Sequence, residues 1–166
     1  MYVIISATNR EGSHTEKVAK EYQKILNEKG IEASIFSLKN LDVLQKNAAF
    51  TEAESEYLIP ASKFIFILPE YNGSFPGVLK AMIDISDIRK SWWGKKALLT
   101  GISTGRAGNL RGMDHISDVL NHMKITVHYN KLPISVIDKV MNEDGIITSK
   151  TTLQVINQQL DEFIKF

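Results

Sequence analysis

Residues 63–84 read KFIFILPEYNGSFPGVLKAMID. The run from Phe64 to Leu68 is entirely apolar and rich in aromatic and β-branched residues, which predicts a strand covered on both faces. Two prolines and two glycines between Pro69 and Gly77 predict a rigid loop. Apolar residues spaced three and four apart then predict a helix from Gly77 onward. A buried strand, a loop and a helix in this order indicate one unit of a parallel α/β sheet.

The same alternation extends from this unit in both directions. The predicted strands are Tyr2–Ser6, Glu32–Ser37, Lys63–Leu68, Lys96–Ser103 and Ile125–Tyr129. The predicted helices are Thr15–Lys29, Thr51–Ala61, Gly77–Asp87, Leu110–Met123 and Thr151–Ile164. No linker-like segment or repeat interrupts them. We therefore expect one domain, residues 1–166, with a doubly wound α/β sheet and right-handed crossovers.

The bulk composition excludes several classes of protein. Twenty basic and nineteen acidic residues leave a net charge of +1, which favours neither a nucleic acid nor an anionic membrane as partner. The absence of cysteine excludes disulfides, thiolate catalysis, Cys-ligated zinc and iron–sulfur clusters, and it fits a reducing compartment. The apolar run at the N-terminus is too short for a signal peptide, and none reaches the roughly 18 residues of a membrane span. We expect a cytoplasmic protein.

In an open α/β sheet, ligands bind outside the carboxyl ends of the strands, so the loops that follow the strands are informative. Residues 6–15, SATNREGSHT, combine hydroxyl groups, Arg10 and a helix N-terminus, which favours a phosphate. This loop matches neither a Walker motif nor G-x-G-x-x-G. The alternative is ordinary capping by Ser13 or Thr15, with Arg10 solvated.

Two further loops have unusual compositions. Residues 68–77 supply backbone groups and an aromatic wall for the edge of a flat heteroaromatic ring; alternatively, Asn72-Gly73 is only a turn that precedes the next helix. Residues 101–110, GISTGRAGNL, allow a ligand to approach the backbone closely; alternatively, they form a flexible connector.

These motifs resemble those of the NAD(P)H-dependent FMN reductases of the flavodoxin-like fold, a family with quinone-, azo- and chromate-reducing members. Residues 69–84 are similar to the signature P-E-Y-N-x-S-x-P-G-x-L-K-N-A-I-D. The first loop is similar to G-S-x-R-x-x-S-x-N through Thr8, Arg10, Ser13 and Thr15. The third is similar to S-x-G-x-x-G-G-L-R through Ser103, Gly105, Gly108, Leu110 and Arg111. The departures are Ala7, Thr8, Thr15 and Asn109; the last replaces a glycine and would narrow the third loop.

The resemblance implies a three-layer α/β/α sandwich with a five-stranded parallel sheet in the order 2-1-3-4-5. It also implies FMN as cofactor, NADPH or NADH as electron donor, a small-molecule acceptor such as a quinone, azo compound, chromate or free flavin, and a homodimer or homotetramer. The residues implied to hold the FMN phosphate are Thr8, Arg10, Ser13, His14 and Thr15. Those implied to line the isoalloxazine ring are Pro69, Glu70, Tyr71, Asn72 and Gly73, and those implied to close its other side are Ser103, Thr104, Gly105, Arg106 and Gly108.

The cofactor would carry the chemistry, so no side chain is assigned as catalytic. Glu70 either transfers a proton or only orders its loop. The four histidines show no metal-ligand spacing. Trp92-Trp93 indicates a packing or subunit-contact patch rather than a substrate shelf. Two other functions stay open: a flavodoxin-like electron carrier that does not oxidise nicotinamides, and a non-catalytic phosphate or nucleotide sensor.

Overall fold

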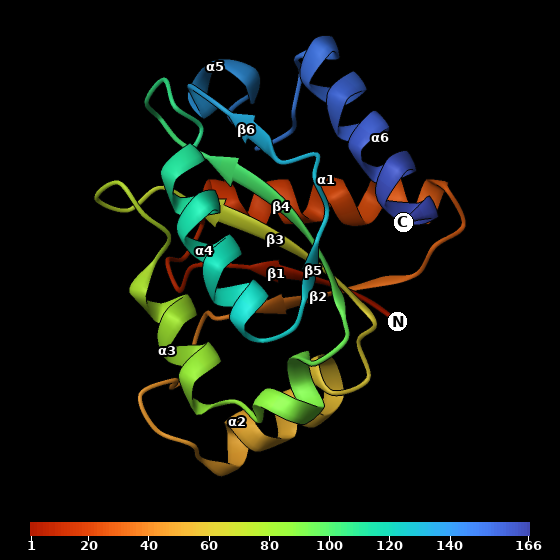
Figure 1. Ribbon diagram of the computed structural model, residues 1–166. Helices are drawn as coiled ribbons and strands as arrows, with labels where there is room; N and C mark the ends of the chain where they lie inside the picture. Colours follow the sequence, from red (N-terminus) through yellow and green to blue (C-terminus); the bar gives the residue numbers. More distant parts are fainter.

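The computed structural model describes residues 1–166 and is built on one parallel sheet with the strand order β2-β1-β3-β4-β5 (Figure 1). The strands are β1 (Tyr2–Ser6), β2 (Ala33–Ser37), β3 (Lys63–Pro69), β4 (Lys96–Ile102), β5 (Thr126–Val127) and β6 (Leu132–Ile134). All strand pairs are parallel. The predicted flavodoxin-like strand order is confirmed.

Helices cover both faces of the sheet. They are α1 (His14–Glu28), α2 (Ala48–Ala53), α3 (Gly77–Ile85), α4 (Leu110–His122), α5 (Ile137–Val140) and α6 (Lys150–Lys165), with the π-helical turns η1 (Glu54–Leu58) and η2 (Ile88–Trp92). Side chains of α1 and α6 form one core, and those of α2, α3 and α4 form the other (Figure 1). The molecule is therefore the three-layer sandwich expected from the sequence.

The apolar run in β3 is explained by these two cores. Phe64 and Phe66 belong to the core under α3 and α4, whereas Ile65 and Ile67 belong to the core under α1 and α6. Because successive side chains of a strand point to opposite faces, a strand between two helical layers must be apolar at every position.

The strand predicted over Ile125–Tyr129 is confirmed only at Thr126–Val127 (β5), and β6, which makes the sheet six-stranded instead of five-stranded, was not predicted. Val127 pairs with Ala97, and Leu132 pairs with Thr100. Between these two pairs β4 has two residues, whereas the edge chain has four. The edge strand is consequently divided into β5 and β6. The side chain of Gln159 in α6 fills the interruption, since its Nε2 donates to the carbonyls of Leu99 (3.1 Å) and Asn130 (2.8 Å).

The tandem tryptophans differ in their surroundings. Trp92 is fully buried in the core, and its Nε1 donates to Ser86 Oγ (2.6 Å), so the packing alternative is confirmed for this residue. Trp93 is partly exposed, and its ring lies 3.9 Å from Lys124 Nζ and 5.2 Å from Arg89 Cζ. Gly94 follows this pair and has a φ of 73°, a left-handed conformation that glycine adopts readily. The chain bends there.

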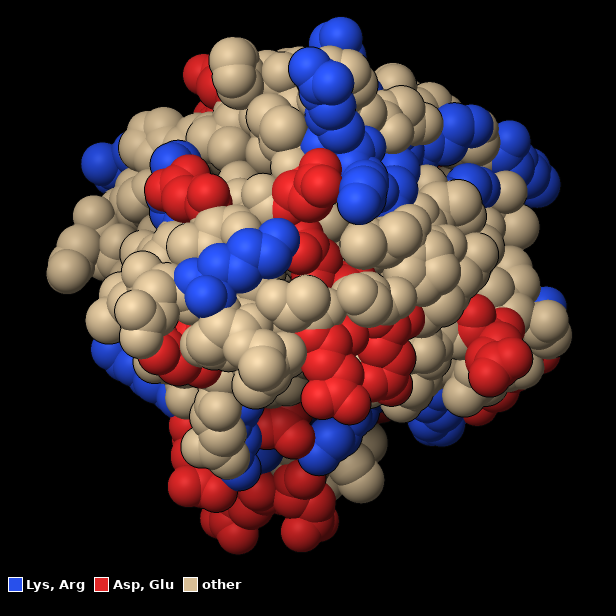
Figure 2. Space-filling model, turned by 90° about the horizontal axis from the view of Figure 1, so that it is seen from below, with Lys and Arg blue, Asp and Glu red and all other residues tan.

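Charged side chains of both signs are mixed over the face that is seen from below (Figure 2). This distribution agrees with the near-zero net charge and does not form the continuous basic field of a nucleic-acid-binding surface. None of the helices combines the length and the apolar character that crossing a bilayer would require.

Candidate functional site

Three loops meet at the edge of the sheet where β1, β3 and β4 end. A cavity of about 240 Å³ lies between them, lined by Arg10, Glu11, Ser13, His14, Thr15, Pro69, Glu70, Tyr71, Ile102, Ser103, Thr104 and Ile137. A second cavity of about 330 Å³ is lined by Glu70, Asn72, Gly73, Ser103, Thr104, Gly105, Arg106 and Ala107. The shared residues Glu70, Ser103 and Thr104 connect them into one groove of a size typical of small-molecule sites.

The N-terminus of α1 forms one end of this groove. Ser13 is the N-cap, and its Oγ accepts a hydrogen bond from the Glu16 amide (3.2 Å). The amides of His14 and Thr15 precede the first hydrogen bond of the helix, so they have no partner within it. The capping alternative is thus confirmed for Ser13, and it leaves free N–H groups and a positive helix end facing the cavity.

Tyr71 links the first two loops. Its hydroxyl lies 2.5 Å from Thr8 Oγ1, and its ring lies 4.1 Å from Arg10 Cζ. Thr8 is buried and is absent from the cavity wall. Tyr71 therefore forms a boundary of the cavity without filling it, and Thr8 contacts Tyr71 from behind this boundary.

His14 has one satisfied and one unsatisfied ring nitrogen. Nε2 lies 2.9 Å from Asp138 Oδ1 in α5, whereas Nδ1 is buried and has no hydrogen-bond partner. A buried polar atom without a hydrogen-bond partner raises the free energy of the folded protein. This Nδ1 atom therefore indicates a position where a ligand would supply the missing hydrogen bond. Nearby, the hydrogen bond from Lys39 (2.6 Å) lowers the pKa of Glu11, which keeps this carboxylate ionised and turned toward Lys39.

Residues 71–74 form a tight hairpin. The backbone groups of Tyr71 and Ser74 exchange hydrogen bonds of 2.8 and 3.1 Å, and Asn72 and Gly73 have φ values of 52° and 78°. Positive φ at both central residues defines a type I′ turn, which Asn-Gly favours. The turn alternative is confirmed, and the same turn presents Asn72 and Gly73 to the second cavity.

The third loop is anchored by hydrogen bonds. Ser103 Oγ donates to the Gly105 carbonyl and accepts from the Gly108 amide, both at 2.9 Å. The amides of Val136 and Ile137 donate to the carbonyls of Gly105 and Ser103, respectively. These hydrogen bonds favour a loop of defined conformation over the flexible-connector alternative. Gly108 lies outside the cavity wall, where a Cβ would approach Pro133 to 2.6 Å.

Asn109 does not narrow this loop, contrary to the expectation. It is fully buried with a φ of 61°, and its Nδ2 donates to the carbonyls of Leu68 and Pro69, each at 3.0 Å. The side chain thus points back toward the end of β3 and holds the second and third loops together.

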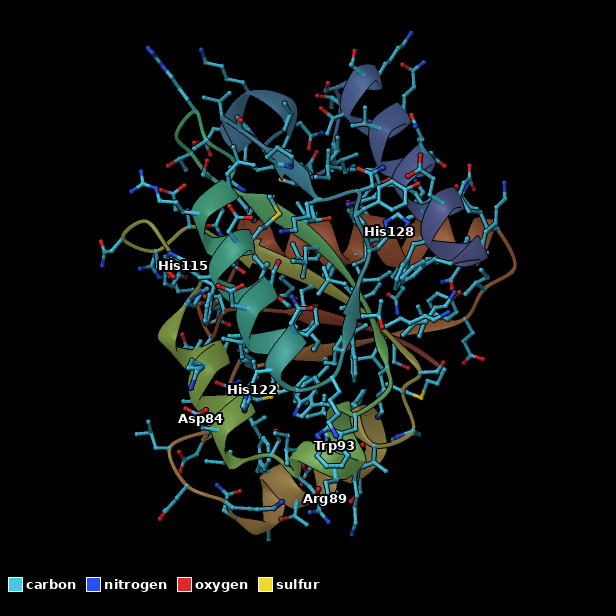
Figure 3. The ribbon with its side chains drawn as sticks, in the orientation of Figure 1. Asp84, Arg89, Trp93, His115, His122 and His128 are labelled. Atoms are coloured by element: carbon cyan, nitrogen blue, oxygen red, sulfur yellow. The ribbon has the colours of Figure 1, made fainter.

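The histidines lie apart from one another. His115 and His122 lie on α4, whereas His128 lies beyond β5, toward α6 (Figure 3). His115 Nδ1 is 2.8 Å from Ser74 Oγ, so it supports the hairpin from outside the groove. The structure contains no group of three or more His, Cys, Asp or Glu residues that could hold a metal ion.

Sequence reasoning missed four residues that line the groove, namely Glu11, Ile102, Ala107 and Ile137, and it also missed Asp138, which pairs with His14. Ile102 and Ala107 lie within the predicted third loop or its strand and could have been included by position. Ile137 and Asp138 belong to α5, a four-residue helix with too few residues to show a periodic pattern. No local signal connects α5 with α1.

Comparisons with known proteins identify the family of this chain. The model of a family described as NADPH-dependent FMN reductase matches residues 2–147. The chain is 30% identical over 108 residues to an NAD(P)H-dependent FMN reductase of Pseudomonas aeruginosa, covering 63% of this chain and 58% of that protein. It is 25% identical over 115 residues to a 2-hydroxy-1,4-benzoquinone reductase of Burkholderia sp., covering 67% of this chain and 63% of that protein.

The chain therefore spans less than two thirds of the length of these two relatives. Among solved structures, the flavoenzyme NAD(P)H:(acceptor) oxidoreductase FerB of Paracoccus denitrificans superimposes with a TM-score of 0.79 at 21% identity. The superposition covers 99% of this chain and 94% of FerB, and at this identity it establishes the fold.

Proposed function

The chain belongs to the family of NADPH-dependent FMN reductases, and from this premise we propose that it is an FMN-containing oxidoreductase. Its electron donor is NADPH or NADH, and its acceptor is a small molecule such as a quinone, an azo compound, chromate or free flavin. The observation that supports the proposal most directly is the division of the groove into two chemically different ends. One end has unpartnered donors for a phosphate, and the other has a backbone edge for a planar ring.

The residues of the groove fit FMN. The amides of His14 and Thr15, the guanidinium of Arg10 and the Ser13 hydroxyl would hold the phosphate at the positive end of α1. The orphaned Nδ1 of His14 lies at the same end and would gain a partner there.

The hairpin and the third loop would hold the ring. Glu70, Asn72 and Gly73 border the second cavity on one side, and Ser103 to Ala107 border it on the other. The Glu70 amide donates to the Ile102 carbonyl (3.0 Å), which extends the β3–β4 ladder to the edge of the groove and makes this wall rigid. A rigid wall binds a planar ring with little loss of conformational entropy.

When bound, FMN would supply the redox chemistry, by accepting a hydride from the nicotinamide and passing reducing equivalents to the acceptor. The contribution of this chain is to bind and orient the ring and to exclude water from one face of it. Glu70 borders both cavities, and its backbone amide anchors the loop.

The electron-carrier alternative shares this fold, so the fold alone does not separate the two functions. The family model favours the reductase, and the near-neutral charge contrasts with the strongly acidic surface expected of such a carrier. The family model also disfavours the sensor. A sensor of phosphate or nucleotides would in addition have no use for the wall that fits a planar ring.

The proposal is tested with purified protein loaded with FMN. Under anaerobic conditions, NADPH or NADH should bleach the flavin band near about 450 nm at a rate that supports turnover. Bound FMN that neither nucleotide bleaches would support the electron carrier instead. A protein that retains no FMN would support the sensor.

Two further properties form part of the proposal. A homodimer or homotetramer follows from the family resemblance, and sedimentation of the FMN-loaded protein would decide between them. A cytoplasmic location is consistent with a chain that lacks cysteine.

A further inference from the structure

The arginines of this chain are concentrated at the groove. The sequence contains four: Arg10, Arg89, Arg106 and Arg111. Three of them lie on the first and third loops or at the start of α4, and none of these three forms a salt bridge. The neighbouring Lys131 is paired with Asp114 (3.0 Å), whereas the carboxylate of Glu70, which borders both cavities, forms no salt bridge. Two of these guanidinium groups, those of Arg10 and Arg106, line the groove, and that of Arg111 lies beside it at Gly73.

Arg10 lies at the phosphate end, whereas the other two lie beside the second cavity. Arg106 lines that cavity, and its backbone carbonyl accepts a hydrogen bond from Ser135 Oγ (2.8 Å), which fixes the loop that carries it. Arg111 reaches the tip of the hairpin, where its Nη1 lies 3.6 Å from the position that a Cβ on Gly73 would occupy. Both side chains are exposed, so they are accessible to a ligand that enters over the ring site.

The number of guanidinium groups exceeds what FMN requires. FMN carries one phosphate, which the N-terminus of α1 and Arg10 would hold at the opposite end of the groove. Arginine binds phosphate oxygens through two parallel hydrogen bonds and stays charged at every physiological pH. Two free arginines beside the ring site therefore indicate a second anionic ligand that lies over the ring.

We infer that Arg111 and Arg106 bind the phosphates of the nicotinamide dinucleotide donor. NADH carries a pyrophosphate and NADPH carries one phosphate more, so either donor presents anionic groups at a distance from its nicotinamide ring. The inference rests on the proposed function, because a hydride donor must place its nicotinamide against the flavin. It assigns a role to Arg111, which the phosphate end of the groove does not use.

The test compares a donor that has phosphates with one that has none. NADPH and 1-benzyl-1,4-dihydronicotinamide both deliver hydride, but only NADPH carries phosphates. In the FMN-loaded protein, the Arg111→Gln variant should lower the ratio of their second-order rate constants for anaerobic bleaching by about tenfold or more. Arg106→Gln should lower it in the same direction. Lys165→Gln, which removes an exposed charge at the far end of α6, is the matched control and should leave the ratio unchanged.

A binding measurement checks the same inference without turnover. ADP-ribose contains the pyrophosphate but no nicotinamide, and calorimetry with the oxidised, FMN-loaded protein should give a dissociation constant about tenfold higher for Arg111→Gln than for the wild type. A loss of bleaching rate with NADH and NADPH alike, together with weaker ADP-ribose binding, assigns the pyrophosphate to Arg111. A loss of rate with NADPH alone, with unchanged ADP-ribose binding, assigns the additional phosphate of NADPH to it. Either pattern supports the inference.

Unchanged rate-constant ratios and an unchanged ADP-ribose affinity in both arginine variants would overturn the inference while leaving the reductase function intact. Failure of the function itself has a different signature. In that case neither NADPH nor the benzyl donor bleaches bound FMN, even in the wild-type protein.

Discussion

At the scale of single residues, the groove is defined by polar atoms that the fold leaves without partners. The amides of His14 and Thr15 and the Nδ1 atom of His14 lack acceptors or donors within the protein. Arg10 makes only a cation–π contact, with Tyr71 at 4.1 Å. Since most buried polar groups in proteins are satisfied, such a concentration at one end of a cavity indicates a ligand rather than a packing defect.

Arg10→Ala is expected to weaken FMN binding about tenfold, or about 1.4 kcal/mol, because it removes a charge-assisted hydrogen bond to the phosphate. The dissociation constant is measured from the quenching of flavin fluorescence by the apoprotein. Lys24→Ala, on the exposed face of α1, is the control and should bind FMN like the wild type. An Arg10→Ala protein with wild-type affinity would remove Arg10 from the site.

At the scale of elements, the divided edge strand depends on one side chain from a distant helix. Gln159 is fully buried; besides donating to two carbonyls, its Oε1 accepts from the Tyr22 hydroxyl (2.7 Å). Burial raises the pKa of Tyr22, so its hydroxyl remains a neutral donor. The side chain of Gln159 thus replaces the ladder hydrogen bonds that the interruption between β5 and β6 removes.

Gln159→Leu should lower the free energy of unfolding by roughly 2–4 kcal/mol, because it leaves buried carbonyls without donors while keeping the volume of the side chain. Urea denaturation of the apoprotein measures the loss. Its neighbour Gln158 is exposed and its side chain forms a hydrogen bond only with Glu162, so Gln158→Leu should change the stability by less than about 0.5 kcal/mol. Equal stability of the two variants would show that the strand is held together in some other way.

A second link between elements depends on pH. Glu54 in η1 is buried and accepts hydrogen bonds from Lys46, the Asp87 amide and Ser91 Oγ. Burial alone would raise the pKa of Glu54, but these hydrogen bonds outweigh it and lower the pKa below the ordinary value of 4.5. Because the folded-state pKa lies below the unfolded one, the stabilisation is present above pH 4.5 and is lost as the pH falls through the folded-state pKa.

Glu54→Gln should therefore reduce the stability at neutral pH, and the difference from the wild type should shrink as the pH falls below about 4.5. Urea midpoints measured between about pH 7 and pH 3 give both curves. Glu52→Gln, at an exposed position in α2, is the control and should follow the wild-type curve. Parallel curves for Glu54→Gln and the wild type would contradict the assigned role of the carboxylate.

At the scale of the whole molecule, the two cores share every central strand, so we expect the chain to unfold as one cooperative unit. A ligand that binds only the folded state, at a free concentration about 100 times its dissociation constant, stabilises by about 2.7 kcal/mol. FMN at that level should raise the melting temperature by about 5–10 °C in a single transition. Riboflavin at the same concentration lacks the phosphate and should give a smaller shift. Two separate transitions, with only one shifted by FMN, would contradict the single-domain prediction.

Much of this architecture could be predicted from the sequence because the signals are local. An uninterrupted apolar strand such as Phe64–Leu68 requires cover on both faces, and Asn72-Gly73 favours a type I′ turn wherever it occurs. The phosphate end was predictable for the same reason, since Ser13 caps a helix whose first amides are free in any context. Strand order and the convergence of the three loops followed from the family resemblance of those loops.

Only the tertiary structure decided which distant residues complete these local pieces. Four contacts join segments that lie far apart in the chain. They connect Asp138 with His14, Arg111 with Gly73, Asn109 with the end of β3, and Gln159 with the edge strand. Each depends on how helices pack on the sheet, and no spacing pattern within one segment encodes that packing. Local periodicity thus determined the elements and the ligand-binding edge, whereas side-chain packing between the layers determined how that edge is closed.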